Sequence, residues 1–166
     1  MNLFLLRHGT AVQSDTAGYS KDADRPLTAK GEHKLRRAAK TMKALDLSFD
    51  LILSSPYLRA RQTAAIVAEA FDAKDRLELS TSLAPGNATR RIIECLHRLP
   101  TPDNVLLVGH EPGLSQLISL LLAGNSNVSV LMKKGGLCKL SAESLKPGCC
   151  ATLQWLLTPK QMALMG

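Results

Sequence analysis

Arginine and histidine side chains follow three apolar runs of this sequence. Arg7 and His8 come directly after residues 3–6. Arg59 follows a second run and His110 a third. Continuous apolar runs are typical of strands buried on both faces of a parallel sheet, and such sheets bind ligands at the carboxyl ends of their strands. Arginine binds oxyanions through two parallel hydrogen bonds, and a neutral imidazole is a nucleophile. The pattern therefore indicates a site for an anionic group at one sheet edge.

Each of these residues also has a simpler interpretation. An Arg-His pair alone is typical of a charged strand end that meets water. His110 could be a core histidine bonded to the backbone. Arg59 is harder to dismiss, because it falls in the first turn of a predicted helix, where the partial positive charge of the helix disfavours a cation. An arginine in that place indicates that something negative is expected there. Arg61, in the same turn, is interpreted as a surface residue.

The segments around these residues resemble the histidine phosphatase superfamily, and most closely its small bacterial members of the phosphohistidine phosphatase SixA type. The matching segments are Leu-Arg-His-Gly at the start, Arg-Pro-Leu-Thr beginning at Arg25, Ser-Ser-Pro-Tyr-Leu-Arg ending at Arg59, and Val-Gly-His ending at His110. They occur in order over nearly the whole chain. The resemblance implies a phosphoglycerate mutase-like fold, with His8 as nucleophile and a phosphoryl group bound by Arg7, Arg25 and Arg59. An exposed loop arginine is the simpler interpretation of Arg25.

The expected chemistry centres on His8, which must be neutral at its attacking nitrogen. Nearby arginines oppose its protonation, and a hydrogen bond from the other ring nitrogen to a backbone carbonyl would fix its tautomer. Attack would give a covalent phosphohistidine that water then hydrolyses. His110 would donate to a phosphoryl oxygen and stabilise the transition state. Two histidines without a carboxylate cluster argue against a metal site, and no glycine-rich phosphate loop occurs, so no cofactor is expected.

Many members of the superfamily place a carboxylate over the leaving group, and the corresponding loop here, residues 83–87, has none. Asp15, Asp22 and Asp24 are the alternatives as general acid, whereas Glu111 is expected to cap a helix. An alkoxide needs a strong general acid to leave, but an imidazole leaves far more easily. The missing acid therefore favours a phosphohistidine substrate.

Three functions are compatible with this sequence. The favoured one is a metal-independent phosphohistidine phosphatase that acts on a phosphorylated protein and has an open site with short loops. The second is a phosphomonoesterase for a small metabolite or sugar phosphate. The third is a non-catalytic phosphate-binding module, which is the least favoured because such a module has no need of His8.

Periodicity predicts the elements that must position these residues. Strand and helix patterns alternate, which predicts a three-layer α/β/α sandwich whose sheet is mostly parallel with an antiparallel edge strand. Residues 1–166 should form a single domain. Helices are expected at residues 28–45, with Thr28 as N-cap, at 57–71 and at 88–99, and a fourth helix should have Pro112 just inside its start. A short strand is expected at residues 77–79. Strands at 137–140 and 151–157 should form a hairpin that turns at 146–148.

Composition narrows the function further. The chain has 45% hydrophobic and 21% charged residues, as an ordinary globular protein does. Its net charge of +7 fits an anionic substrate but also fits a solubility surface. The basic residues are scattered and only 4% of residues are aromatic, so no nucleic-acid partner is expected. No signal peptide or bilayer-spanning segment is expected, and the four cysteines form no Cys-x-x-Cys pair, which favours reduced thiols and a cytoplasmic protein. A monomer is expected.

Overall fold

A six-stranded sheet forms the centre of the fold in the computed structural model, which describes residues 1–14, 18–98, 102–146 and 148–165. The strands run in the order β3-β2-β4-β1-β5-β6 across the sheet. Their bounds are β1 Asn2–Arg7, β2 Leu51–Ser54, β3 Leu77–Leu79, β4 Asn104–Gly109, β5 Leu137–Ala142 and β6 Ala151–Leu157.

The sheet is mixed, as predicted. The pairs β1–β4, β2–β4 and β2–β3 are parallel, whereas β5 is antiparallel to β1 and β6 is antiparallel to β5. The antiparallel edge therefore contains two strands, the hairpin that the sequence predicted, rather than a single strand. Residue 147 of the predicted hairpin turn lies outside the described residues.

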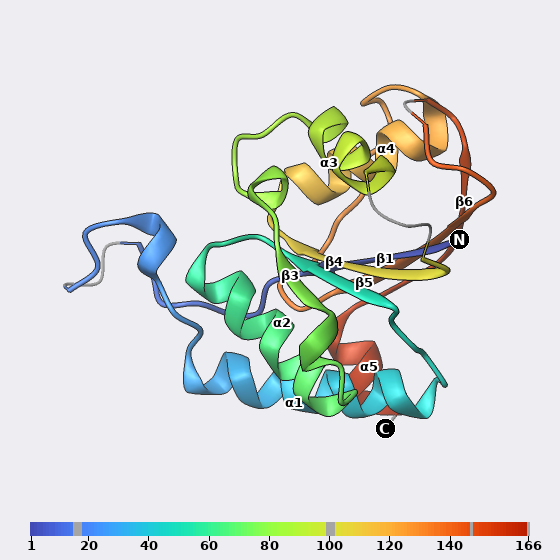
Figure 1. The fold of residues 1–166 in the computed structure, drawn as a ribbon. Coiled ribbons are helices and arrows are strands. Elements are labelled where there is room, and N and C mark those ends of the chain that lie inside the picture. The colour runs from blue at the N-terminus through green and yellow to red at the C-terminus, as the bar shows by residue number, and fades with distance from the viewer. Residues whose placement is uncertain (15–17, 99–101, 147, 166) are drawn as a thin grey trace.

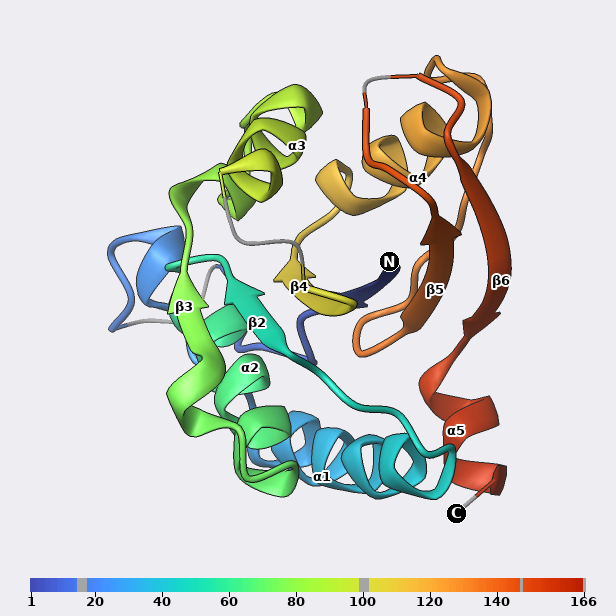
Figure 2. The ribbon, with the colours of Figure 1, turned by 45° about the vertical axis from the view of Figure 1, so that its right-hand side comes forward.

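Helices cover both faces of the sheet, which gives the three-layer sandwich (Figure 1). Helices α1, α2 and α5 lie on one face and α3 and α4 on the other, and a turned view shows the same separation (Figure 2). The helix bounds are α1 Ala29–Ala44, α2 Leu58–Ala70, α3 Thr89–His97, α4 Gly113–Ala123 and α5 Pro159–Met165. None of the helices in the described part of the chain is long and apolar enough to cross a bilayer.

Strand β1 contributes to the core on both faces of the sheet. Leu3 and Leu5 pack with buried residues of α3 and α4. Phe4 and Leu6 point to the opposite side, into the layer that contains buried residues of α1, α2 and α5. All four side chains are at most 2% exposed. The continuous apolar run therefore reflects burial on two faces, and β1 is fixed tightly enough to position the residues that follow it.

Most helix boundaries agree with the sequence prediction to within one or two residues. The side chain of Thr28 accepts a hydrogen bond from the Gly31 backbone at 3.0 Å, as an N-cap should. Pro112 lies at the N-cap of α4 rather than just inside the helix. The predicted end of the third helix, residue 99, lies outside the described residues. Helix α5 was not predicted.

Candidate active site

The two histidines of the predicted site meet because their strands are neighbours in parallel register. Arg7, the last residue of β1, pairs with Gly109, the last residue of β4. The backbone of His8 donates a hydrogen bond to the Gly109 carbonyl at 3.0 Å. His8 and His110 therefore leave the same sheet edge side by side, and their ring centroids lie 4.9 Å apart.

One ring nitrogen of His8 is fixed by the backbone. Its Nδ1 lies 2.7 Å from the carbonyl oxygen of Gly9. A carbonyl can only accept, so Nδ1 carries the proton and Nε2 carries the lone pair. Arg59 is consistent with this tautomer, because its Nε donates to His8 Nε2 at 3.3 Å. The nitrogen whose lone pair can attack an electrophile is therefore Nε2, and in this structure that lone pair accepts a hydrogen bond from the Arg59 guanidinium at 3.3 Å.

His8 is held neutral by its surroundings. Burial is the largest effect that lowers the pKa of His8, and the charges of Arg59, Arg7 and Lys134 lower it further. The hydrogen bond to Gly9 acts in the other direction, yet the pKa falls from 6.5 to about 4. At neutral pH the imidazole is therefore uncharged, as a nucleophile must be.

Arg59 reaches His8 from the first turn of α2. Its side chain is only 5% exposed and its guanidinium lies 5.1 Å from the centre of the Tyr57 ring. Thr63, one turn later on α2, donates its hydroxyl to the Arg59 carbonyl at 2.7 Å and accepts the backbone N–H of Gly9 at 3.1 Å. This threonine ties the start of α2 to the residue after His8, which fixes the arginine against the imidazole.

His110 has one ring nitrogen bound and one unbound among the described residues. Its Nε2 lies 2.8 Å from the hydroxyl of Ser55, and that same hydroxyl accepts the backbone N–H of Tyr57 at 3.3 Å. The hydroxyl proton can then be donated to His110 Nε2, which leaves the proton on Nδ1. Nδ1 is buried and has no hydrogen-bond partner in the described part of the chain. His110 is therefore bonded to a side chain rather than to the backbone, and its unpaired nitrogen is able to donate.

Arg7 has an unpaired buried nitrogen as well. One terminal nitrogen donates to the carbonyl of Met132 at 2.7 Å, and this bond anchors the side chain to the segment before β5. Its Nε is buried without a partner among the described residues. Unpaired buried donors are costly, so an N–H of Arg7 and one of His110 without partners at one sheet edge indicate an anion-binding site.

The comparisons with known proteins agree with this geometry. The model of the histidine phosphatase superfamily (branch 1) matches residues 3–84. The phosphohistidine phosphatase SixA of Escherichia coli (strain K12) is 30% identical over 128 residues, which cover 76% of this chain and 77% of that protein. The chain belongs to the histidine phosphatase superfamily. Its membership and its SixA relative support a phosphatase activity.

Solved structures of other phosphatases have the same fold. The protein histidine phosphatase SixA in complex with tungstate matches with a TM-score of 0.82 and 24% identity, over 96% of this chain and 98% of that one. A phosphoserine phosphatase of Entamoeba histolytica, in complex with phosphoserine, matches with a TM-score of 0.71 and 15% identity, over 96% and 98% of the two chains. Structures of this fold thus include phosphatases named for a protein substrate and for a small one.

Among the described residues, Arg25 is linked to the site through the carboxylate of Asp22. It has no direct contact with His8 among the described residues. Its Nε donates to Asp22 Oδ1 at 2.8 Å, and one terminal nitrogen donates to the Val12 carbonyl at 2.6 Å. Asp22 in turn accepts a hydrogen bond from Arg59 at 2.8 Å. The structure thus brings Arg7, His8, Arg59 and His110 together directly and links Arg25 to them.

The position of Asp22 bears on the missing general acid. Desolvation, the largest single effect on this carboxyl, raises its pKa, but the hydrogen bonds and charges of Arg25 and Arg59 together lower the pKa below its usual value. A carboxyl with a lowered pKa is ionised at neutral pH and is a poor proton donor. Asp15 lies outside the described residues, and Asp24 makes no described side-chain contact with the site.

Lys134 is a site neighbour that the sequence did not reveal. The backbone N–H of Gly135 donates to the carbonyls of Arg7 and His8, at 3.0 and 3.1 Å. Gly135 has a φ of 77°, a conformation that suits glycine and lets the turn approach β1 closely. This contact brings the charge of Lys134 near enough to lower the pKa of His8. A Lys-Lys-Gly-Gly segment gave no periodic signal, so only the fold could place it.

A cavity of about 260 Å³ is lined in part by His110. The loop of residues 82–87 forms one wall, and the start of α4 forms another. Glu111 is the only acidic residue among those that line it, and its Oε1 accepts the backbone N–H of Ser115 at 3.2 Å. Glu111 therefore caps α4, as the sequence predicted, and residues 83–87 place no carboxylate in this cavity.

The two buried histidines should make stability depend on pH. Burial is the largest effect that lowers the pKa of His110, and the positive charges of His8, once His8 is protonated in acid, and of Arg59 lower it further, to about 3. Both folded-state pKa values lie below that of an unfolded histidine, so the unfolded chain binds more protons as the pH falls below about 6.5. Each histidine should therefore reduce the free energy of unfolding by about 2 kcal/mol between pH 7 and pH 5.

Urea unfolding at pH 7, 6 and 5 measures this dependence. Replacing His110 by Gln should remove about half of it, whereas replacing the exposed His33 should leave it unchanged. Equal slopes in wild type and His110→Gln would contradict a buried neutral pair. Because His8 stays neutral down to about pH 5, kcat should have no acidic limb above that pH.

Proposed function

We propose that this phosphatase hydrolyses phosphohistidine on a protein, without a metal ion, through a covalent phosphohistidine at His8. The observation that carries the proposal is the state of His8: a neutral imidazole with Nδ1 bonded to Gly9 and Nε2 facing Arg59. The remaining groups are assigned from their positions. Arg7, Arg25 and Arg59 bind the phosphoryl oxygens, and His110 donates Nδ1–H to one of them.

The first step transfers the phosphoryl group to His8. The Nε2 lone pair forms a bond to phosphorus while the P–N bond of the substrate breaks. The departing imidazole, which carries a proton on its other ring nitrogen, keeps the electron pair and leaves as a neutral ring. The new phosphohistidine is cationic in its ring, and the Gly9 carbonyl stabilises it through the 2.7 Å hydrogen bond from Nδ1. Arginine side chains offset the charge on the phosphoryl oxygens, which is the main requirement of phosphoryl transfer.

The second step regenerates the enzyme. Water attacks phosphorus, the bond to His8 Nε2 breaks, and orthophosphate leaves while His8 returns to its neutral form. The same burial and positive charges that lower the His8 pKa also disfavour the cationic phosphohistidine ring. His8 is therefore a good leaving group as well as a nucleophile, which suits turnover rather than storage of the phosphoryl group.

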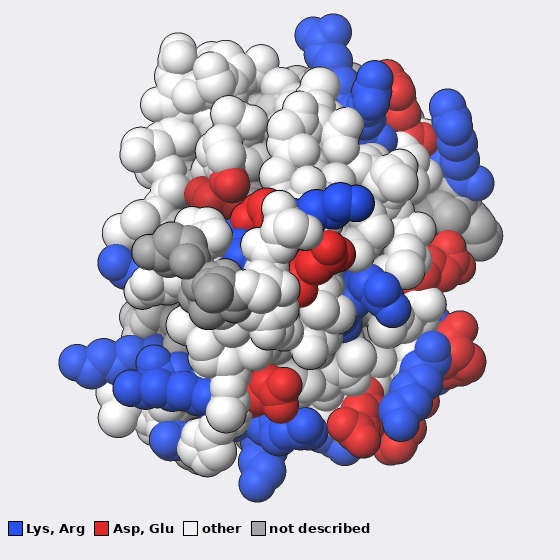
Figure 3. Space-filling view, turned by 90° about the vertical axis from the view of Figure 1, so that its left-hand side faces the viewer, with Lys and Arg blue, Asp and Glu red and all other residues white. Residues whose placement is uncertain are grey.

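The choice of a protein substrate rests on the surroundings of the leaving group. Asp22 is ionised and therefore a poor proton donor, and the carboxylate of Glu111 is engaged by the start of α4. An imidazole needs less help to leave than an alkoxide does. The face at this sheet edge carries several basic side chains, which gather most densely at its lower left (Figure 3). Lys34 and Lys134 line one small hollow that Gly9 also lines. These lysines suit a partner with an acidic surface.

A small phosphate ester is the second candidate. The observation in its favour is the cavity beside His110, which contains Asn87, Glu111 and Gln116 as polar groups. Its volume of about 260 Å³ is near the lower end of small-molecule sites.

Parallel assays separate the two candidates. A histidine-containing phosphotransfer protein, labelled with 32P on its histidine, is compared with p-nitrophenyl phosphate and phosphoserine. We expect kcat/KM for the phosphoprotein to exceed that for phosphoserine by about 100-fold or more, which is the contribution of a general acid that an alkoxide leaving group would need. p-Nitrophenolate leaves without a proton, so p-nitrophenyl phosphate measures the displacement alone. Faster hydrolysis of phosphoserine than of the phosphoprotein would reverse the choice of substrate. Loss of all activities in His8→Ala would show that they share one site.

A further inference from the structure

Asp22 binds two arginines of the proposed site, Arg25 and Arg59. It begins a short helical turn, η1 (Asp22–Asp24). Its Oδ1 accepts from Arg25 Nε at 2.8 Å and also from a terminal nitrogen of Arg25. Its Oδ2 accepts from Arg59 at 2.8 Å, and its backbone carbonyl accepts from Arg59 at 2.6 Å. One residue thus engages two arginines with both carboxylate oxygens and its main chain.

These contacts use the same N–H groups that an incoming phosphoryl group needs. A carboxylate and a phosphoryl group bind an arginine fork in the same way, with two oxygens against two parallel N–H groups. The Nε and terminal N–H of Arg25 that form this fork both point at Asp22, and the remaining terminal nitrogen donates to Val12. A phosphoryl group can therefore bind the Arg25 fork only if the Asp22 carboxylate moves away.

The burial of the partners shows which of them can move. The side chain of Asp22 is 48% exposed, whereas those of Arg25 and Arg59 are 17% and 5% exposed. A half-exposed carboxylate can rotate into water at low cost, but a buried guanidinium loses its partners if it leaves. Displacement should therefore move the carboxylate outward and leave the arginines in place.

We propose that Asp22 is an internal anionic competitor, which occupies the phosphoryl-binding groups of Arg25 and Arg59 until the substrate displaces it. This inference rests on the proposed function, because it takes these two arginines to bind the phosphoryl group. A free phosphate ion must displace Asp22 with the binding energy of the phosphoryl site alone. A phosphorylated protein adds contacts outside the phosphoryl site, and that binding energy can offset the displacement. Asp22 thus favours large substrates over orthophosphate and limits inhibition by the product.

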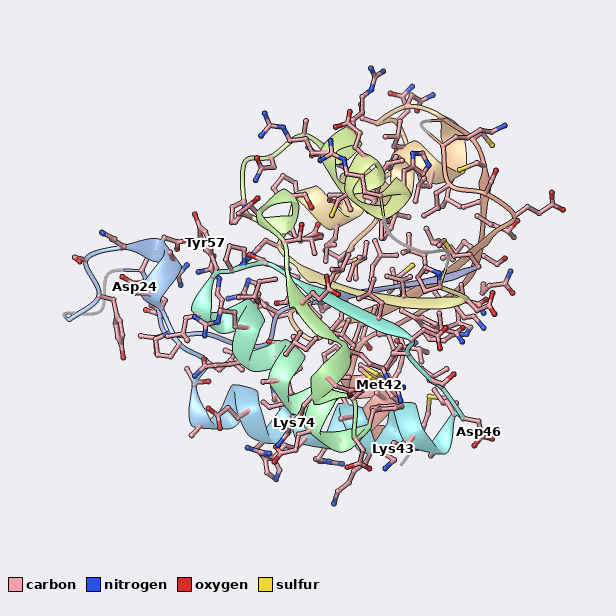
Figure 4. The ribbon with its side chains drawn as sticks, in the orientation of Figure 1. Asp24, Met42, Lys43, Asp46, Tyr57 and Lys74 are labelled. Atoms are coloured by element: carbon pink, nitrogen blue, oxygen red, sulfur yellow. The ribbon has the colours of Figure 1, made fainter. Side chains whose placement is uncertain are left out.

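Calorimetric titration with orthophosphate tests the competitor directly. Asp22→Asn keeps the size of the side chain but removes its charge, so we expect it to bind orthophosphate about fivefold to tenfold more tightly than wild type does, since exposed ion pairs contribute only modestly. Asp24→Asn is the matched control. Asp24 is an exposed carboxylate two residues later in the same turn, without a described partner, and it lies at the same end of the molecule as Tyr57 (Figure 4). We expect its affinity to stay within about twofold of wild type.

Additional variants keep the test decisive. Asp22→Ser serves if Asp22→Asn does not fold, as judged by thermal unfolding. In the background of Arg25→Ala, the gain from Asp22→Asn should shrink, because one of the two contested forks is gone. Equal or weaker phosphate binding by Asp22→Asn would overturn the competitor and indicate that Asp22 only positions the arginines.

The phosphate titration of Asp22→Asn and the phosphoprotein assay of the proposed function can fail independently. Tighter phosphate binding by Asp22→Asn, together with failure to hydrolyse the phosphoprotein, would retain the competitor and reject the proposed substrate. Unchanged binding together with phosphoprotein hydrolysis would do the reverse. With the phosphoprotein as substrate, Asp22→Asn should raise the potency of orthophosphate as a product inhibitor by the same factor.

Discussion

Replacing His8 by alanine should abolish turnover of every phosphorylated substrate, with a loss of about 10⁴-fold or more in kcat, and should also abolish covalent labelling of the chain. The physical reason is that no other side chain is expected to replace His8 as the nucleophile. Removing the nucleophile leaves water as the only attacking group, and the arginines can stabilise charge but cannot split the displacement into two easier steps. Burial and neighbouring positive charges keep this imidazole neutral, so at pH 7 nearly every molecule of the wild type is competent.

Rapid quenching with 32P-labelled phosphoprotein measures both parts of this prediction. The wild type should carry an acid-labile, base-stable label, as expected for phosphohistidine, and the label should vanish in His8→Ala. His33→Ala is the control, since His33 is an exposed histidine of α1. A label that persists in His8→Ala would place the nucleophile elsewhere, with His110 the first candidate because its ring lies 4.9 Å from that of His8.

The geometry gives a reason to favour His8 over His110 as the nucleophile. Both are buried and both have lowered pKa values. The difference lies in their partners. A carbonyl fixes the proton of His8 on Nδ1 and leaves the lone pair on Nε2, beside an arginine. Ser55 occupies Nε2 of His110, whose remaining nitrogen is then a donor. One ring is therefore prepared to attack and the other to donate.

Much of this site could be predicted from the sequence because it depends on strand ends. The carboxyl ends of parallel strands meet at one edge, so the apolar runs before His8 and His110 sufficed to bring those residues together. Arg59 was recognisable from a local conflict, a cation in the first turn of a helix that has no acidic residue there. Periodicity and local electrostatics are both properties of short segments, so both can be recognised in the sequence without knowledge of the fold.

The contacts of Asp22 and Lys134 could not be predicted in the same way. Asp22 lies in a three-residue helical turn and Lys134 in a loop, and neither segment is long enough or regular enough for a period to relate position in sequence to direction in space. Asp22 was considered only as a possible acid, and its role as partner of two arginines depends on how the first loop folds back over α2. Lys134 reaches His8 only because Gly135 packs against β1.

Helix α5 is a different case, because its signal was present. Thr158 precedes Pro159, and Gln161 follows three residues after the threonine. The Gln161 side chain accepts the backbone N–H of Thr158 at 2.8 Å, and Thr158 Oγ1 accepts the backbone N–H of Gln161 at 3.3 Å, so the pair forms a capping box. Met162 is fully buried, and its carbonyl accepts the Thr41 hydroxyl of α1 at 2.8 Å. A short helix with one buried anchor lacks the repeated apolar spacing that identifies longer helices.

Replacing Arg59 by methionine should reduce kcat/KM by about 10³-fold, the usual effect of losing a group that stabilises developing charge on a phosphoryl group. Methionine keeps much of the apolar stem, which limits the loss of packing. Lysine should restore only part of the activity, since an ammonium group retains the charge but cannot offer the planar fork. Arg61→Met is the matched control: Arg61 lies two residues later in the same helix and is exposed, so its loss should change kcat/KM less than about twofold.

A titration distinguishes an electrostatic role of Arg59 from mere support of the fold. Arg59 is one of the charges that lower the pKa of His8, so Arg59→Met should raise that pKa from about 4 toward the ordinary value, whereas Arg59→Lys should raise it less. Nuclear magnetic resonance of the imidazole protons follows the pKa directly. The acidic limb of the rate profile should move upward with it, because protonated His8 has no lone pair at Nε2. If Arg59→Met loses activity while the His8 pKa stays near 4, the guanidinium does not act on this imidazole. The contact between Nε and Nε2 would then have no part in keeping the nucleophile neutral.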